Sequence, residues 1–137
     1  MLRLSVVTPM KKIVTDVEVE EVFVPAYVGE LNILDGHAPL VTTLSTGILK
    51  YRLKGSSKLL AAAISWGYCE VSNNVVNVLA ETAETPEEVE RDRATSSEKK
   101  ALENLSRTDI EPKDIQKYGN KLARAQARLQ LVKEYTN

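Results

Sequence analysis

The stretch GELNILDGHAPLVTTLSTG, from Gly29 to Gly47, places apolar runs between turn-forming residues. Three glycines and Pro39 interrupt it, and Leu40–Leu44 has the composition of a short strand between two turns. It also holds His37, the only histidine of the chain. The stretch predicts a strand flanked by loops, and it leaves three interpretations of those loops: a catalytic loop, a metal site or a contact surface for another protein.

The same strand-and-turn pattern continues on both sides of this stretch. Leu2–Thr8, Asp16–Ala26 and Gly47–Lys54 are rich in apolar residues that alternate with polar ones, with a slip at Glu20–Glu21 that indicates a β-bulge. Gly55–Ser57 and Asn73–Asn74 have the composition of tight turns. Many short strands at regular spacing predict an antiparallel β-sandwich or barrel over residues 1–84.

The pattern changes near Thr85, where helix signals begin. In Thr85-Pro86-Glu87-Glu88, Thr85 can cap a helix, Pro86 suits the first helical position and Glu88 completes a capping box. No helix breaker follows between Glu87 and Leu105, so we expect a first helix there. A loop at Ser106–Pro112 and a second helix over about 113–135 complete a helical hairpin over residues 85–137.

The second helix carries two stripes. One is an apolar seam at spacings of three and four, formed by Ile115, Tyr118, Leu122, Ala125, Leu129 and Val132. The other is a basic stripe, formed by Lys117, Lys121, Arg124 and Arg128. Such a stripe is often a solvated face, but like charges four residues apart repel by a few tenths of a kcal/mol. An acidic partner or a phosphate would relieve that repulsion.

The first helix has few apolar residues, and Arg91–Lys100 is almost entirely polar. A helix that buries little apolar surface gains little free energy from docking, at about 25 cal/mol per Å². We therefore expect a hairpin that is weakly held and can detach at low cost. Gly119, inside the second helix, is expected to be a fray point or a hinge.

The composition argues against several function classes. The net charge is −1, which argues against broad capture of nucleic acid or anionic lipid, and no apolar run approaches the length of a membrane span. The N-terminus reads as a strand, so we expect no signal or transit peptide. His37 is alone, which excludes a histidine cluster for a metal, and Cys69 reads as packing rather than as a nucleophile for His37. Spacing alone thus predicts a non-catalytic interaction module with no metal.

Two segments resemble the epsilon subunit of F-type ATP synthases. The opening stretch is similar to the pattern G-E-x-G-I-L-P-G-H-A-P-L with a later Gly, although Asn32 and Asp35 replace a usual Gly and Pro. Trp66–Glu84 is similar to G-G-F-x-E-V-x-x-x-x-V-x-V-L-A-x-x-A-E, and Trp66 replaces a usual Gly. The order of the parts, a β domain followed by an acidic helix start and a helical hairpin, resembles the family along the whole chain.

The resemblance implies a flattened β-sandwich of about ten strands followed by two antiparallel helices. It implies a non-catalytic rotor subunit of a proton- or sodium-translocating synthase, on the cytoplasmic face of the bacterial plasma membrane or the stromal face of the thylakoid. The β domain would contact the γ subunit and the c ring through Glu30, His37 and Leu40, with Glu30 and His37 on loops. An extended hairpin would inhibit ATP hydrolysis and meet the α/β subunits, offering an acidic β-subunit segment the basic residues Lys117, Lys121, Arg124 and Arg128.

Some bacterial members of the family bind ATP on the compact hairpin through a motif like [IL]-D-x-x-R-A. Val89–Ala94 aligns with it, with Glu90 in place of Asp, and Arg124 and Arg128 match the paired arginines of the second helix. No cofactor is required, but ATP is a candidate regulatory ligand, because arginine suits phosphate through its fork of donors. The implied ATP-binding residues are Glu84, Glu90, Arg93, Ala94, Arg124 and Arg128. The alternatives are a stand-alone nucleotide sensor, or arginines that serve only the β-subunit contact or the hairpin surface.

Overall fold

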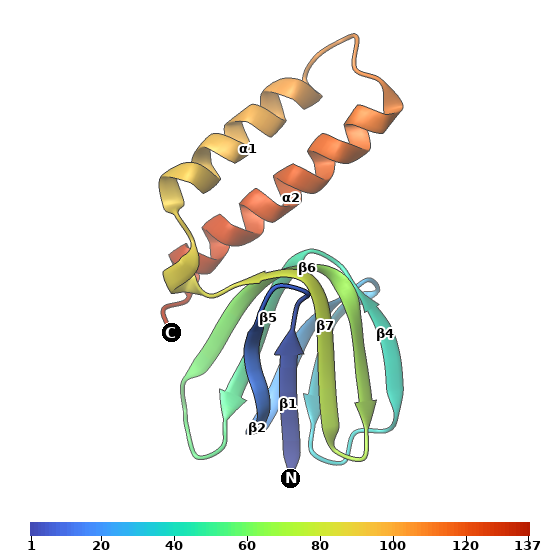
Figure 1. Ribbon diagram of the computed structural model, residues 1–137, viewed down its shortest axis with the longest axis vertical. Helices are drawn as coiled ribbons and strands as arrows, with labels where there is room; N and C mark the ends of the chain where they lie inside the picture. Colours follow the sequence, from blue (N-terminus) through green and yellow to red (C-terminus); the bar gives the residue numbers. More distant parts are fainter.

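The computed structural model describes residues 1–137 and consists of a β-sandwich followed by a helical hairpin (Figure 1). The predicted fold class is confirmed. The strands and helices, in chain order, are β1 (Leu2–Val7), β2 (Lys12–Ala26), β3 (Gly29–Leu34), β4 (Leu40–Leu44), β5 (Gly47–Leu53), β6 (Leu59–Ser72), β7 (Val75–Glu84), the 3₁₀ helix η1 (Pro86–Glu88), α1 (Arg91–Leu105) and α2 (Pro112–Glu134).

The strands form one strongly curved sheet that closes on itself through β1. This strand pairs in parallel with β7 and antiparallel with β2, while β6 joins β7 to β5 and β5 joins β6 to β2. The short strands β3 and β4 extend this circuit beside β2 and β6. The structure has seven strands where the resemblance implied about ten, because β2 and β6 are 15 and 14 residues long and each pairs with different neighbours along its length.

Alternation of apolar and polar residues builds the core. In β1, Leu2, Leu4 and Val6 point inward and are buried, as the period of two requires. They belong to a cluster of 18 buried residues between the layers. The bulge expected at Glu20–Glu21 is present as a register shift between β2 and β5, and Asn73 and Asn74 form the β6–β7 turn with positive φ angles of 51° and 61°. Local pattern therefore determines most of the sandwich.

The first helix begins later than expected. The capping sequence at Thr85 starts only the single turn η1, and α1 begins at Arg91. Val89 is extended between them, with φ −79° and ψ 126°, because its side chain packs against the cluster of Ala61, Ala63, Ala127 and Leu131 under the hairpin. Burial of one apolar side chain against the sandwich thus overrides a local helix signal.

The hairpin lies on one end of the sandwich, with α2 next to the sheet and α1 on the outer side of α2 (Figure 1). The helix α2 packs against both the sheet and α1, and its buried residues are Ala125, Ala127 and Leu131. The single apolar seam expected on this helix is wrong at Ile115, which is exposed. Gly119 does not interrupt α2. Neither helix is long and apolar enough to cross a membrane.

Candidate functional site

A cavity of about 270 Å³ lies where the sandwich meets the hairpin. The end of β7, η1, α1 and α2 all contribute to it, and its lining residues are Glu84, Glu88, Glu90, Arg93, Ala94, Ser97 and Arg128. Five of the six residues implied for ATP are therefore brought together here: Glu84, Glu90, Arg93, Ala94 and Arg128. They meet because the extended Val89 turns α1 back over the end of β7.

An ion pair crosses the boundary between sandwich and hairpin at this cavity. Arg128 on α2 donates from Nε to Glu84 Oε1 at the end of β7, at 2.6 Å. Both side chains are largely buried, at 30% and 25% exposure, so the pair is shielded from solvent more than a surface pair. The contact ties α2 to the sheet and uses part of the donor capacity of Arg128.

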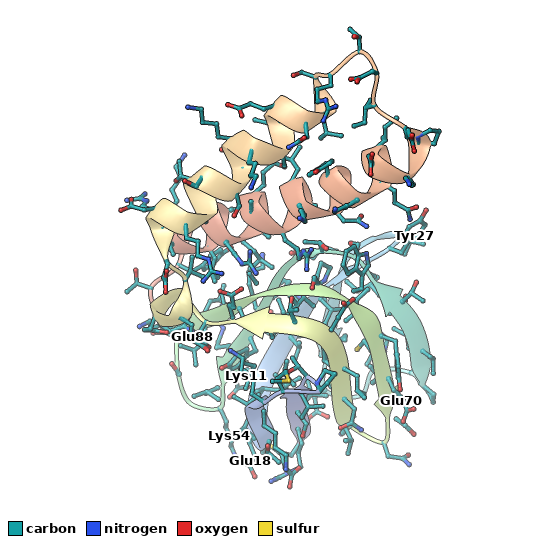
Figure 2. All side chains as sticks on the ribbon, turned by 45° about the horizontal axis from the view of Figure 1, so that its top comes forward. Lys11, Glu18, Tyr27, Lys54, Glu70 and Glu88 are labelled. Carbon is teal, nitrogen blue, oxygen red and sulfur yellow. The ribbon has the colours of Figure 1, made fainter.

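A second carboxylate of the cavity, Glu88, is also occupied. The Thr85 amide and hydroxyl donate to its Oε1 at 3.1 and 2.9 Å, and Lys11 from the β1–β2 turn pairs with its other oxygen (both residues are labelled in Figure 2). The Lys11 ammonium, with the Thr85 amide, holds the pKa of Glu88 below its ordinary value. Glu90 and Arg93 are exposed, and their side chains make no hydrogen bond or ion pair, so these side chains remain available to a ligand.

A neighbouring cavity of about 390 Å³ lies between the two helices. It shares Ser97 and Arg128 with the first, and its lining residues are Ser97, Lys100, Ala101, Tyr118, Lys121, Arg124 and Arg128. Four of these side chains are cationic and none is acidic. The sixth implied ATP residue, Arg124, is therefore in the adjoining cavity. The pair of cavities has an acidic end and a basic end.

The basic stripe is divided by the way α2 docks. Lys117 and Lys121 lie over the ring of Tyr118, at 5.4 and 5.6 Å from its centroid, and both are exposed. Arg124 and Arg128 face the sandwich instead, Arg124 over the ring of Trp66 at 5.6 Å and Arg128 against Glu84. Half of the stripe is thus engaged within the chain when the hairpin is docked.

Three residues that contact or line the two cavities were not identified from the sequence: Trp66, Lys11 and Lys100. Trp66 lies in β6 with a φ of 36°, a backbone conformation that costs a bulky residue about 1–3 kcal/mol. Lys100 was detectable, because Arg93, Ser97 and Lys100 are spaced four and three apart and so share one face of α1. Nothing in the local pattern near Lys11 indicates its partner, which lies 77 residues further along the chain.

Of the residues implied for the γ subunit and the c ring, Glu30 lies in β3 rather than on a loop. Its carboxylate pairs with Lys50 at 3.0 Å, and the two side chains come from β3 and β5, which both pair with β2. Burial alone would lower the pKa of Lys50, but Glu30 and the Tyr135 phenol together raise it above its ordinary value. Glu30 is therefore already engaged within the chain.

His37 and Leu40 lie at the opposite end of β3 from Glu30. His37 belongs to the loop between β3 and β4, where its Nδ1 lies 2.7 Å from the Ala38 carbonyl oxygen and so acts as a donor. Leu40 begins β4 and packs half-buried against the core. The loop is joined to the β6–β7 turn by hydrogen bonds of Asn74 with Gly36 and Asp35, at the end of the sandwich away from the hairpin (Figure 1). The structure therefore separates Glu30 from His37 and Leu40.

An apolar patch that the sequence analysis did not identify lies on the outer face of β4, β6 and β7. Val41, Tyr68 and Leu79 are 70%, 46% and 40% exposed. Tyr68 is the cross-strand neighbour of both Thr43 and Leu79, and Glu70 (Figure 2) is the neighbour of Val41. Exposed apolar side chains gathered on one face are typical of a protein interface.

The chain holds no arrangement suited to a metal or to a cysteine nucleophile. No group of three or more His, Cys, Asp or Glu side chains is placed to bind a metal ion. Burial, and to a smaller extent Glu70, raises the pKa of the Cys69 thiol to about 11. A neutral, buried thiol is a poor nucleophile.

Comparison with known proteins finds relatives that match the sandwich and the hairpin together. Residues 1–86 match the family described as "ATP synthase, Delta/Epsilon chain, beta-sandwich domain". The ATP synthase epsilon chain of Bdellovibrio bacteriovorus is 44% identical over 137 residues, covering 97% of this chain and 95% of the relative. The epsilon chain of Geotalea daltonii is 41% identical over 131 residues, covering 96% and 93%.

Solved structures with a similar fold come from two mitochondrial ATP synthases. A chain of the Euglena gracilis OSCP/F1/c-ring structure has a TM-score of 0.81 and 23% identity, covering 94% of this chain and 79% of that one. A chain of the Tetrahymena thermophila central stalk/c-ring structure has a TM-score of 0.61 and 13% identity, covering 96% of both. These identities show a common fold.

Proposed function

This chain belongs to the family of ATP synthase epsilon chains, and from that premise we propose that it is a non-catalytic central-stalk subunit that links γ to the c ring. The observation that carries the proposal is that the 44% identical relative matches over 97% of the chain, so that sandwich and hairpin are both included. The relatives are named as epsilon chains, that is, as one subunit of a larger complex, and this supports a non-catalytic role. The subunit is then peripheral to the membrane, on the cytoplasmic face in a bacterium.

Two surfaces of the sandwich suit the two rotor partners. The apolar patch of Val41, Tyr68 and Leu79 offers γ a surface whose burial stabilises a complex. The end of the sandwich that carries His37 and Leu40 offers the c ring a hydrogen-bonded loop. Glu30 contributes to a partner contact only from the other end of β3, and it must then share its carboxylate with Lys50.

The hairpin acts as the regulatory part in this proposal. Its contact with the sandwich has a small apolar centre of Ala61, Ala63, Ala127 and Leu131, on which Ile48, Val89 and Tyr135 pack half-buried. So small an apolar centre favours detachment. Detachment frees Arg124 and Arg128 from Trp66 and Glu84. With Lys117 and Lys121 they form a continuous basic stripe that can bind an acidic segment of the β subunit. This contact of the extended hairpin inhibits ATP hydrolysis.

Deletion of residues 86–137 tests this role in the assembled enzyme. We expect the sandwich to assemble with γ and the c ring, and ATP hydrolysis by the complex to rise. Loss of assembly without any change in inhibition would contradict the assignment of regulation to the hairpin.

A second proposal concerns ATP as a regulatory ligand of the docked hairpin. The paired cavities suit a nucleotide, since the free carboxylate of Glu90 can accept from an adenine amino group, and the cationic cavity can hold phosphates. Their volumes together fall in the range of about 300–1,000 Å³ that is usual for small-molecule sites. Family membership favours such sensing as a property of the subunit rather than as a stand-alone function.

Calorimetry on the full chain tests the nucleotide site. We expect ATP to bind at micromolar concentration, with affinity reduced in Arg93→Gln. Lys117→Gln is the matched control, because Lys117 is exposed on α2 and lines neither cavity. Binding that is absent or only millimolar, or an equal loss in both variants, would reject the site.

A further inference from the structure

Trp66 occupies a position where the backbone disfavours it. It is the only tryptophan of the chain, it lies half-buried in β6, and its φ of 36° is in the left-handed region that suits glycine. The following residue, Gly67, also has a positive φ, of 144°. A bulky side chain held in such a conformation indicates that the side chain itself makes a contact that offsets the strain.

That contact is with Arg124 of α2, whose guanidinium lies over the indole ring at 5.6 Å from the ring centroid. Trp66 belongs to the sandwich and Arg124 to the hairpin, so the stack crosses the boundary between them. The guanidinium of Arg124 makes no hydrogen bond or ion pair within the chain, whereas that of Arg128 already donates to Glu84. Arg124 is therefore the guanidinium of the cationic cavity whose donors are free.

A guanidinium can contact an aromatic ring and donate hydrogen bonds to an anion at the same time. The indole attracts the positive charge of the group through its π face and accepts no conventional hydrogen bond, so the five N–H donors of the guanidinium stay available. Arg124 also lines the cavity together with Lys100, Lys121 and Arg128. An anion there can accept from the N–H groups of Arg124 while the cation–π contact with Trp66 is kept.

We propose that Trp66 is a positioning residue that holds Arg124 for phosphate binding and thereby couples occupation of the cationic cavity to docking of the hairpin. The phosphate part of this inference rests on the proposed nucleotide site. A phosphate group orders Arg124, and an ordered Arg124 strengthens the contact with Trp66, so each event favours the other. The coupling is reciprocal: docking of the hairpin strengthens phosphate binding by the same factor by which bound phosphate favours docking.

The docking part is tested without ligand, by hydrogen exchange of α2 in the full chain. We expect Trp66→Leu and Arg124→Gln each to speed exchange around Ala127 and Leu131 roughly three- to tenfold, and the double variant to add nothing. Trp66→Phe should restore protection, since it keeps an aromatic face. Lys121→Gln is the matched control, because it removes one charge from the same cavity but Lys121 does not contact Trp66.

If α2 exchanges at the wild-type rate in Trp66→Leu, or if the two substitutions have additive effects in the double variant, the Trp66–Arg124 contact does not help to dock the hairpin and the proposal is overturned. If Trp66→Leu folds poorly, Trp66→Gly replaces it, because glycine accepts the positive φ without strain. A sandwich that is more stable in Trp66→Gly while its hairpin exchanges faster would support the proposal. A hairpin that exchanges at the wild-type rate would overturn it.

The phosphate part is tested with two probes, ATP and inorganic tripolyphosphate, by calorimetry and Trp66 fluorescence. We expect both probes to bind and to protect α2, with affinities lowered roughly three- to tenfold in Trp66→Leu and close to wild type in Trp66→Phe. Equal affinity in Trp66→Leu would overturn the coupling. Protection by ATP alone would assign the affinity to the adenosine end and overturn the phosphate role of Arg124. Absence of ATP binding in the wild type would refute the proposed nucleotide site and the phosphate part, while ligand-free exchange still decides the Trp66–Arg124 contact.

Discussion

At the scale of single residues, Gly67 is the position in β6 that admits no side chain. A Cβ there would lie 1.8 Å from the Leu79 carbonyl oxygen, on the backbone of the neighbouring strand, and φ is 144°. Gly67→Ala is expected to reduce the free energy of unfolding by at least ~3 kcal/mol, because strand β7 cannot move without breaking its ladder. Gly36→Ala is the control, with a φ of 85° but open space around its Cβ, and should cost only about 1–2 kcal/mol. Equal losses in urea unfolding would contradict the steric account.

Cys69 predicts a dependence of stability on alkaline pH. Burial raises the pKa of its thiol from the ordinary value of 9.0 to about 11, so the folded state keeps the thiol neutral while the unfolded chain ionises. The stability that the neutral thiol contributes is full below pH 9 and is lost as the pH rises toward 11. Denaturant unfolding between these pH values should show a shallower loss in Cys69→Ser. If the wild-type protein loses stability with rising pH no more steeply than Cys69→Ser, the Cys69 thiol is not the cause of the pH dependence.

At the scale of elements, docking of α2 depends on a small apolar cluster. Leu131 is fully buried against Ala61, Ala63 and Ala127, so Leu131→Ala should cost about 2–4 kcal/mol, expressed as detachment of the hairpin. Hydrogen exchange should rise throughout α1 and α2 and stay unchanged in the strands. Ile115→Ala on the same helix is the control, since Ile115 is 50% exposed. Faster exchange in β1 and β7 as well would show that hairpin and sandwich unfold as one unit.

At the scale of the whole molecule, the apolar patch and the hairpin should be separable. Tyr68→Glu places a charge in the centre of the patch of Val41, Tyr68 and Leu79, and it should weaken co-purification with γ by more than about tenfold. ATP binding to the isolated chain should not change, because the patch does not line either cavity. Leu102→Glu on α1 is the control, an equally exposed apolar residue outside the patch. A variant that still binds γ normally would exclude this face as the interface.

Much of the fold was predictable because the interactions that decide it are local. Alternation placed Leu2, Leu4 and Val6 in the core, and Asn73–Asn74 marked a turn. The start of α1 was not predictable in this way, because the capping box at Thr85 is a true helix signal that Val89 cuts short by packing on a surface far away in the sequence. The position of Glu30 was misjudged for a similar reason: the resemblance implied a loop, but pairing with β2 makes Glu30 part of a strand.

The candidate site was also predictable only in part: its residues could be named from the sequence, but their contacts could not. The resemblance of Val89–Ala94, and of Arg124 and Arg128, to the ATP-binding members of the family named six residues. The structure brings five of them into one cavity and places Arg124 in the next. The partners of those residues could not be named from the sequence. Lys11 meets Glu88 and Trp66 meets Arg124 only because the hairpin folds back over the sandwich.

The sequence by itself determined the two-part organisation of this protein, because strand alternation, helix periodicity and turn residues act over a few neighbouring positions. The resemblance of Gly29–Gly47 and Trp66–Glu84 to known motifs indicated the family. Only the tertiary structure decided how the basic stripe of α2 is divided, which carboxylates of the cavity are already paired, and that a strained Trp66 stacks on Arg124. These features depend on side chains that lie far apart in the chain. Their free energies depend on burial and charge at the boundary between the two parts, which exists only when the hairpin is docked.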